Sequence, residues 1–308
     1  MAQSARIIFM GTPDFAVASL RALVEAGCDV VAVVTAPDRP SGRGLQLTPS
    51  PVKQAAAAAK IPVLQPEKLR DPAFLVQLAS FQADLQVVVA FRMLPEVVWA
   101  MPTIGTFNLH GSLLPHYRGA APINWAIING ETETGVTTFL IEKEIDTGQM
   151  IFQDTEPIHP DDTAGTLHDR LMERGAALVV KTVRAIEAGN YARTPQPNPT
   201  DPKPAPKLHR ETTQINWNQP ARQVRNFVRG LSPFPTAWTL INNKFFKIYA
   251  ASVTNEAPDF AGEPGQAYTD QKKKIMIRAA DEWLSIDVLQ AEGKRRMTTE
   301  EFLRGNSL

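Results

Sequence analysis

The sequence contains little cysteine and no long apolar stretch. Cys28 is the single cysteine in 308 residues, so no internal disulfide can form. No apolar run approaches the roughly 18 to 20 residues that span a bilayer, and the first residues lack the pattern of a secretory signal. These absences argue against a disulfide-stapled or membrane-spanning protein. We expect a cytoplasmic protein without a membrane partner.

Motifs of several common enzyme classes are also missing. Gly11-Thr12-Pro13-Asp14 stands where a dinucleotide-binding loop would be, but the second and third glycines of Gly-x-Gly-x-x-Gly are absent. This argues against nicotinamide or flavin chemistry. No serine lies in a Gly-x-Ser-x-Gly elbow. No grouping of His, Cys, Asp and Glu has the spacing of metal ligands, so we expect no metal.

The formal net charge is zero, but charge is unevenly distributed along the chain. Residues 1–202 contain 16 Lys and Arg against 21 Asp and Glu, a balance of −5, whereas residues 203–308 contain 16 against 11, a balance of +5. A basic C-terminal part is suited to a polyanionic partner such as nucleic acid. A difference of this size is also compatible with chance on a solvated surface, so charge alone leaves the partner open.

The first two thirds of the chain alternate between predicted strands and helices. Apolar runs at Arg6–Met10 and Val30–Val34 flank a segment with helical spacing, Phe15–Ala26. This β-α-β unit predicts a parallel sheet. The alternation continues to a long helical pattern at Thr166–Ala188. We therefore predict an α/β fold with a Rossmann-like, mostly parallel sheet and helices on both faces.

The composition changes after residue 194. Six prolines occur between residues 195 and 206, a density that excludes a helix or an inner strand and favours a stiff extended spacer. Short apolar runs beyond it predict a smaller, OB-like β-barrel. We expect a catalytic domain at 1–194, a proline-rich linker at 195–206 and a C-terminal β-barrel domain at 207–308.

One predicted strand directs two polar side chains to a single place. In Phe107-Asn108-Leu109-His110-Gly111, alternation puts Asn108 and His110 on the same face. They lie at the carboxyl end of the strand, where open α/β sheets bind ligands. An amide can donate to a developing oxyanion, and an imidazole can exchange a proton near neutral pH. A hydrogen-bonded pair at a strand end is the alternative interpretation.

A charged loop, Glu142–Gly148, follows the strand predicted at Val136–Ile141. Its end, Asp146-Thr147-Gly148, is suited to placing a carboxylate over a neighbouring site. A carboxylate beside His110 would hold its tautomer and favour its charged form. The alternative is that Asp146 only caps an Asx-type turn, and for this segment taken alone that alternative is the better one.

A third segment, Thr35–Gly44, is interrupted by proline and glycine and contains Arg39 and Arg43. These breaks predict an exposed loop beside the sheet edge. Arginines in such a loop could meet phosphate, although a plain solvated loop has the same composition.

Together these segments resemble the folate-dependent formyltransferases over nearly the whole chain. The motifs that carry the resemblance are Asn108-x-His110, Ser112-Leu113-Leu114-Pro115, Tyr117-Arg118-Gly119 and Asp146-Thr147-Gly148. One segment departs from the family, because Phe91-Arg92-Met93-Leu94-Pro95 replaces the more common Tyr-Gly-x-x-Leu-Pro form in the region that lines the pterin pocket.

The resemblance implies an enzyme whose co-substrate and formyl donor is 10-formyltetrahydrofolate. It implies that the acceptor amine attacks the formyl carbon directly, while Asn108 and protonated His110 hold the oxyanion. Asp146 would keep His110 charged and help to move the amine proton. The residues expected to contact the folate are Ser112, Leu113, Leu114 and Pro115.

The acceptor is narrowed by Gly11–Ala16, by Pro37–Lys53 and by the expected C-terminal domain. All three resemble those members of the formyltransferase family that formylate initiator methionyl-tRNA for translation initiation. The resemblance assigns Arg43 to tRNA binding. We expect a monomer. Two alternatives stay open: a formyltransferase that acts on a sugar-nucleotide amine, and a non-catalytic RNA-binding protein.

Overall fold

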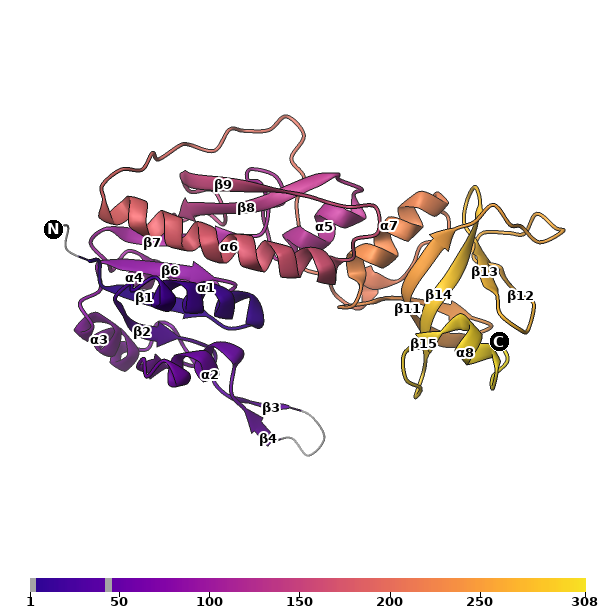
Figure 1. Cartoon of the computed structure of the whole chain (residues 1–308), viewed down its shortest axis with the longest axis horizontal. Coiled ribbons are helices and arrows are strands. Elements are labelled where there is room, and N and C mark those ends of the chain that lie inside the picture. The colour runs from indigo at the N-terminus through magenta and orange to yellow at the C-terminus, as the bar shows by residue number, and fades with distance from the viewer. Residues whose placement is uncertain (1–3, 42–45) are drawn as a thin grey trace. The chain divides into compact units, whose positions relative to one another are not determined.

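The computed structural model describes residues 4–41 and 46–308. The chain forms two compact units, and Figure 1 colours the chain by residue number. The first unit comprises Met1–Arg118, Gly135–Glu156 and His168–Lys203, and the second comprises Gly119–Thr134, Pro157–Leu167 and Pro204–Leu308. Each unit is therefore made of several separate stretches of the chain. The sequence analysis instead expects one continuous catalytic domain at 1–194 and one continuous C-terminal domain at 207–308.

The first unit is built on a seven-stranded sheet with the order β5-β2-β1-β6-β7-β8-β9. β1 (Ile7–Gly11) pairs in parallel with both β2 (Val30–Val34) and β6 (Leu85–Val89). β5 (Val63–Leu64) extends the sheet on one side and β7 (Gly105–His110) on the other, again in parallel. The chain order of the strands reverses between β1 and β6, and open α/β sheets bind ligands at the carboxyl ends beside such a switch point.

Two further strands complete this sheet. β8 (Glu133–Leu140) pairs antiparallel with β7, and β9 (Met150–Pro157) forms the edge. The predicted fold class, a mostly parallel Rossmann-like sheet, is confirmed. β8 is longer than the strand predicted at Val136–Ile141, because its polar start also takes part in the sheet.

Helices cover both faces of the parallel strands, as predicted. On one face, α3 (Pro72–Ser80) and α4 (Glu96–Trp99) share a buried apolar cluster with side chains of β1 and β6. On the other face, α6 (Ala164–Glu187) lies so close to β7 that a Cβ at Gly175 would stand 2.6 Å from Leu109 Cδ2. α1 (Asp14–Glu25) and α2 (Pro51–Ala58) pack against each other.

The starts of α2 and α3 follow directly from local sequence. Each begins with a proline, which suits the first helical position because its missing N–H would have no partner there. The preceding Ser50 and Asp71 are the caps: their side-chain oxygens accept from the backbone N–H groups of Lys53 and Ala73. Such caps typically contribute about 1 kcal/mol each.

The second unit contains an antiparallel sheet of half-barrel form, with the order β10-β11-β14-β13-β12 and β15 paired to β14. The expected small C-terminal β domain is therefore confirmed. Its strands are β10 (Ala237–Ile241), β11 (Lys244–Val253), β12 (Ala267–Thr269), β13 (Ile275–Arg278), β14 (Trp283–Ala291) and β15 (Met297–Thr298). The unit also contains a short 3-10 turn (Glu211–Thr213) and α8 (Thr299–Leu303).

Two helices far apart in sequence pack together in this second unit. α5 (Pro122–Ile128) contacts α7 (Ala221–Leu231), and a Cβ at Gly230 would lie 2.7 Å from Ile128 Cγ1. This contact explains why Gly119–Thr134 belongs with the C-terminal part. α7 begins at Ala221, because Pro220 precedes it and the Asp281 carboxylate accepts from the Ala221 N–H at 2.7 Å.

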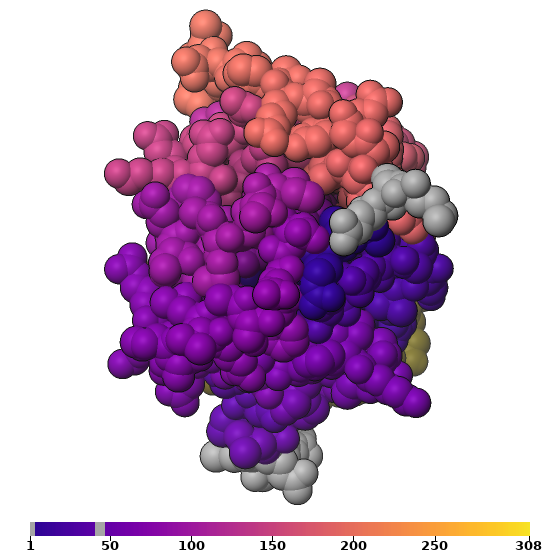
Figure 2. Space-filling model, turned by 90° about the vertical axis from the view of Figure 1, so that its left-hand side faces the viewer, coloured from indigo at the N-terminus to yellow at the C-terminus, as the bar shows by residue number. Residues whose placement is uncertain are grey.

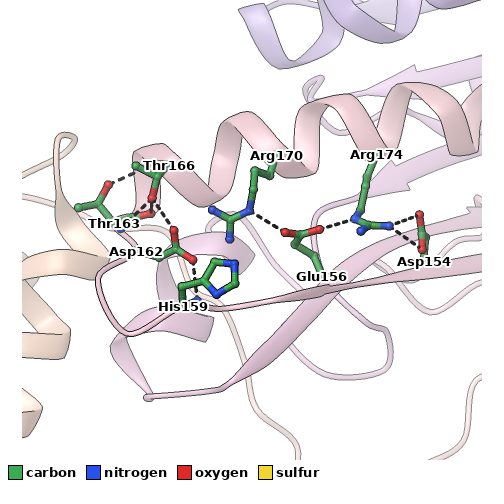
Figure 3. Close-up of polar contacts among 8 residues, drawn as sticks. All are labelled: Asp154, Glu156, His159, Asp162, Thr163, Thr166, Arg170 and Arg174. Carbon is green, nitrogen blue, oxygen red and sulfur yellow. Dashed lines mark hydrogen bonds and ion pairs between the residues drawn. The ribbon is translucent and has the colours of Figure 1, made fainter.

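A buried carboxylate joins β9 to α6 within the first unit (Figure 3). Glu156 is only 5% exposed, and its two oxygens accept from Arg170 Nε at 2.6 Å and from Arg174 Nε. Arg174 also donates to both oxygens of Asp154, at 3.0 and 3.1 Å. Burial acts to raise the pKa of Glu156, but the hydrogen bonds from the two guanidinium groups outweigh it and hold this pKa below its usual range.

The start of α6 is held by short-range polar contacts in the second unit, also drawn in Figure 3. The Thr163 hydroxyl accepts from the Thr166 N–H at 3.2 Å, and Thr166 donates to Asp162 at 2.9 Å. The other Asp162 oxygen accepts from the His159 N–H at 2.7 Å.

In the part of the chain that the structure describes, no helix has both the length and the apolar character needed to cross a membrane.

We predict that Glu156→Gln lowers the free energy of unfolding by about 1–2 kcal/mol at pH 7, since charged hydrogen bonds are lost but the arginines keep some contact with water. The pKa of Glu156 is lowered in the folded state, so this stabilisation is fully present above the unfolded-state value of about 4.3. It is lost as the pH falls through the lower folded value. Urea unfolding at pH 7, 5, 4 and 3.5 measures the difference from wild type.

The matched control is Glu173→Gln, which removes an exposed carboxylate from the same helix. It should leave the unfolding midpoint within error of wild type at every pH. A stability loss for Glu156→Gln that stayed constant down to pH 3.5 would contradict the assigned role of the carboxylate.

Candidate functional site

The structure places Asn108 and His110 side by side on one face of β7, at its carboxyl end. Asn108 pairs with Val88 of β6, whose side chain belongs to the cluster beneath α3 and α4. Thr106 points to the same face, because its hydroxyl donates to the Trp99 carbonyl of α4 at 2.7 Å. Asn108 and His110 follow Thr106 on the same face of β7, beyond the end of the apolar cluster beneath α3 and α4. They lie next to the point where the strand order of the sheet reverses.

His110 is almost fully buried, with 6% of its side chain exposed. Its Nε2 lies 2.8 Å from the backbone carbonyl oxygen of Tyr117. A carbonyl oxygen can only accept, so Nε2 carries a hydrogen and donates. Nδ1 is consequently the nitrogen that remains for a carboxylate or a ligand.

Asp146 is the acidic residue that the fold brings to this imidazole. Its Oδ2 lies 3.9 Å from His110 Nδ1, and its side chain is 15% exposed. This separation is within ion-pair range but too long for a direct hydrogen bond. An N–H on Nδ1 can therefore serve a third atom while the carboxylate stabilises the positive charge of the ring.

The Asn108 side chain is only partly buried. Within residues 4–41 and 46–308, its amide makes no hydrogen bond, and neither of its polar atoms is sealed from solvent. An accessible amide without a protein partner, beside a buried imidazole, is suited to donate to a ligand oxygen.

The turn after β7, Ser112–Pro115, is held rigidly. The Ser112 side chain is completely buried and its hydroxyl donates to the His116 carbonyl at 2.7 Å. Leu114 is also buried, whereas Leu113 and Pro115 are half-exposed. Contact between this segment and a folate stays a prediction, and the two half-exposed side chains are the ones with surface to offer.

Two residues outside the expected motifs fix this turn. The Thr137 hydroxyl donates to the Ser112 carbonyl at 2.7 Å and accepts from the Leu114 N–H and from Gln153 Nε2. Gln153 also donates to the Leu114 carbonyl at 2.9 Å. No local sequence signal identifies them, because both lie on neighbouring strands more than twenty residues away.

The segment after β6 is held by an arginine. Arg92 donates through Nη1 to the Glu67 carbonyl at 2.7 Å and through Nη2 to the Pro66 carbonyl. Burial lowers the pKa of Arg92, and the nearby charge of Arg39 adds to this. Arg92, which marks the departure from the family pattern, thus ties the end of β6 to another part of the first unit.

The segment Thr35–Gly44, which contains Arg39 and Arg43, has more regular structure at its base than the sequence suggests. Arg39–Ser41 forms β3 and pairs antiparallel with β4 (Gln46–Thr48), where we expected only an exposed loop. The partner strand lies outside Thr35–Gly44, so the composition of that segment by itself does not indicate the pairing. Asp38 anchors the base through Lys53 Nζ at 2.6 Å and Gln65 Nε2 at 2.8 Å, and these hydrogen bonds lower its pKa. Arg43 lies outside the described residues.

The basic residues of the second unit differ in whether their side chains are available to bind a polyanion. Arg229 is engaged internally, since it donates to Asn226 at 2.9 Å and to the Asp162 carbonyl at 3.1 Å. By contrast, Lys272 and Lys273 have exposed side chains. Their backbone N–H groups, together with that of Lys274, donate to one oxygen of Asp270, and this lowers the pKa of Asp270 to about 2.

Among the described residues, no group of three His, Cys, Asp or Glu side chains is arranged to hold a metal ion.

Solved structures with the same fold match nearly the full chain. HypX from Aquifex aeolicus, in complex with tetrahydrofolic acid, has a TM-score of 0.65 at 20% identity; the match covers 98% of this chain and 47% of HypX. The sugar 3N-formyl transferase WlaRD, in the presence of dTDP and 5-N-formyl-THF, has a TM-score of 0.67 at 21% identity, covering 95% of this chain and all of WlaRD. At these identities the likeness shows the fold alone.

Sequence relatives are much closer. The methionyl-tRNA formyltransferase of Parabacteroides distasonis is 53% identical over 310 residues, covering 97% of this chain and 95% of the relative. Residues 5–183 match the family model described as formyl transferase, and residues 207–307 match the formyl transferase C-terminal domain. The chain therefore belongs to the methionyl-tRNA formyltransferase family.

Proposed function

We propose that the protein transfers a formyl group from 10-formyltetrahydrofolate to the amino group of initiator methionyl-tRNA. The observation that carries this proposal is the convergence of Asn108, His110 and Asp146 at the carboxyl edge of the sheet. The names of its close relatives support the choice of acceptor. Such a reaction serves translation initiation and takes place in the cytoplasm, and we propose that the enzyme acts as a monomer.

The residues present fit a formyl donor. The accessible Asn108 amide and the Nδ1 side of His110 offer two donors for one carbonyl oxygen. Low exposure of the imidazole strengthens its electrostatic interactions, because little water competes with them. The donor itself supplies an acyl carbon at the formate level of oxidation, bonded to a nitrogen that can leave.

The step that follows is direct acyl transfer. The amine forms a new C–N bond to the formyl carbon, the old C–N bond breaks, and one proton passes from the attacking amine to the leaving nitrogen. During addition the formyl oxygen gains negative charge, which Asn108 and the Nδ1–H of His110 stabilise. The Asp146 carboxylate, 3.9 Å from Nδ1, balances the positive ring and is placed to relay a proton through water.

The phosphate-rich acceptor is proposed to contact basic groups. Arg43, by the family resemblance, and exposed lysines such as Lys272 and Lys273 are the candidates. Contacts of this kind act mainly through charge, so binding should weaken steeply with salt.

We predict that Asn108→Ala and His110→Ala each lower the turnover of formyl transfer by at least about 100-fold, the typical effect of losing one oxyanion donor. The folded structure should persist, because Asn108 makes no side-chain hydrogen bond in the described chain and the ring of His110 lies at a strand end. Single-turnover formylation of methionyl-tRNA measures the effect. His168→Asn, which changes a half-exposed histidine of α6, should keep full activity. Near-normal turnover in both alanine variants would reject the catalytic assignment.

An acceptor competition tests the substrate class. Purified protein with 10-formyltetrahydrofolate should formylate aminoacylated initiator tRNA and leave a sugar-nucleotide amine and glycinamide ribonucleotide unmodified. Chromatography of the three products identifies which amine has reacted. Formylation of the sugar nucleotide alone would establish the first alternative function. Binding of RNA without formylation of any acceptor would establish the second.

We predict that Arg43→Ala raises the KM for methionyl-tRNA about 10-fold or more at physiological salt, since a charged phosphate contact is lost. The KM for the folate should stay unchanged. Steady-state kinetics at 50 and 200 mM salt give both constants. Arg21→Ala, which removes an exposed arginine from α1, is the control and should behave as wild type. Unchanged tRNA kinetics for Arg43→Ala would argue for another acceptor.

A further inference from the structure

The proline-rich segment after α6 is anchored to the first unit at several points. Thr194 exchanges two backbone hydrogen bonds with Met150 of β9, at 2.8 and 2.9 Å. Further along, the Lys203 carbonyl accepts from the Tyr117 N–H at 2.6 Å. Figure 2 shows this part of the chain at the surface, in salmon. It is therefore a strap over the first unit as well as a connection.

Gln196 is the residue of this strap that reaches the candidate site. Its Nε2 donates to the backbone carbonyls of Asp146 and Gly148, each at 2.8 Å. Its Oε1 accepts from Arg118 Nε at 3.1 Å and from Arg118 Nη2 at 2.6 Å. The two hydrogens and the two lone pairs of this amide are thus all used. Such saturation fixes the side chain in one orientation.

These contacts form one connected set of hydrogen bonds that links the two sides of the His110 imidazole. His110 Nε2 donates to the Tyr117 carbonyl, and the next residue along the chain is Arg118, which holds Gln196. Gln196 in turn holds the backbone of Asp146, whose carboxylate faces His110 Nδ1. Both sides of the imidazole are therefore positioned by one connected set of hydrogen bonds.

The loop that carries Asp146 needs an external anchor. Asp146 has φ +56°, in the left-handed region that costs a residue with a side chain about 1 kcal/mol or more. Its neighbour Ile145 is 64% exposed, so apolar burial does not hold this stretch. Two hydrogen bonds from a single fixed amide, on either side of Thr147, define where the carboxylate lies.

We propose that Gln196 is a positioning residue that sets the geometry of Asp146 toward His110, and that Arg118 orients Gln196. This inference rests on the proposed function, because its consequence is catalytic. Gln196 itself does not touch the reacting atoms. A shift of about 1 Å at a catalytic group can reduce turnover about 100-fold.

The decisive variant is Gln196→Glu. Its carboxylate can still accept from Arg118 but cannot donate to the two carbonyls, so it detaches the Asp146 loop while the contact with Arg118 is kept. We expect kcat for formyl transfer to fall about 10- to 100-fold, with the KM values for both substrates within about twofold and an unchanged melting temperature. The control is Asn198→Asp, which makes the same chemical change at an exposed position of the strap and should keep wild-type kinetics.

A mutant cycle tests whether Gln196 acts through Asp146. In an Asp146→Asn background, Gln196→Glu should lower kcat little further, because the carboxylate that it positions is already gone. A full additional loss would overturn the proposal, and so would a kcat for the single variant within twofold of wild type or a change confined to KM.

Hydrogen exchange separates this inference from the proposed function, since it requires no turnover. Peptides covering residues 142–149 should exchange faster in Gln196→Glu than in wild type or in Asn198→Asp. Equal exchange in the three proteins would overturn the positioning role even if formyl transfer is observed. If the wild-type protein formylates no acceptor but the exchange difference is present, the proposed function fails and the structural role of Gln196 stands.

Discussion

The site depends first on the hydrogen bond from His110 Nε2 to the Tyr117 carbonyl. This bond decides which imidazole nitrogen is left for chemistry, and it places that nitrogen opposite Asp146. Tyr117 is itself held in the left-handed region, at φ +61°. Strain of this kind persists only where the surroundings over-determine the backbone. The rigid return of the chain after β7 is therefore part of the machinery proposed for formyl transfer.

Long-range polar contacts hold each segment around the site. Thr137 and Gln153 secure the turn after β7, Arg92 secures the end of β6, and Gln196 secures the Asp146 loop. In every case a side chain binds backbone carbonyls or N–H groups of a loop that lacks regular pairing of its own. Buried backbone groups require partners, and here the partners also fix the positions of the groups proposed to act in formyl transfer.

The composition of the proline-rich segment does not indicate the hydrogen bonds that attach it to the first unit. Its proline density correctly excludes a helix or an inner strand, yet proline leaves the carbonyls and the intervening residues free to bind. Gln196 and Lys203 use that freedom to attach to two places in the first unit, and Thr194 just before the segment attaches to a third. The same segment therefore connects two units and supports one of them.

The sequence by itself determined the elements whose cause is local. Apolar runs predicted the parallel strands, proline and capping residues started α2 and α3, and alternation set Asn108 and His110 on one face of β7. Only the tertiary structure decided that Asp146 meets His110, that α5 joins the second unit and that Gln196 reaches the site. The physical reason is distance along the chain: local signals follow the period of a helix or strand, whereas contacts between residues tens of positions apart arise only when packing brings those elements together.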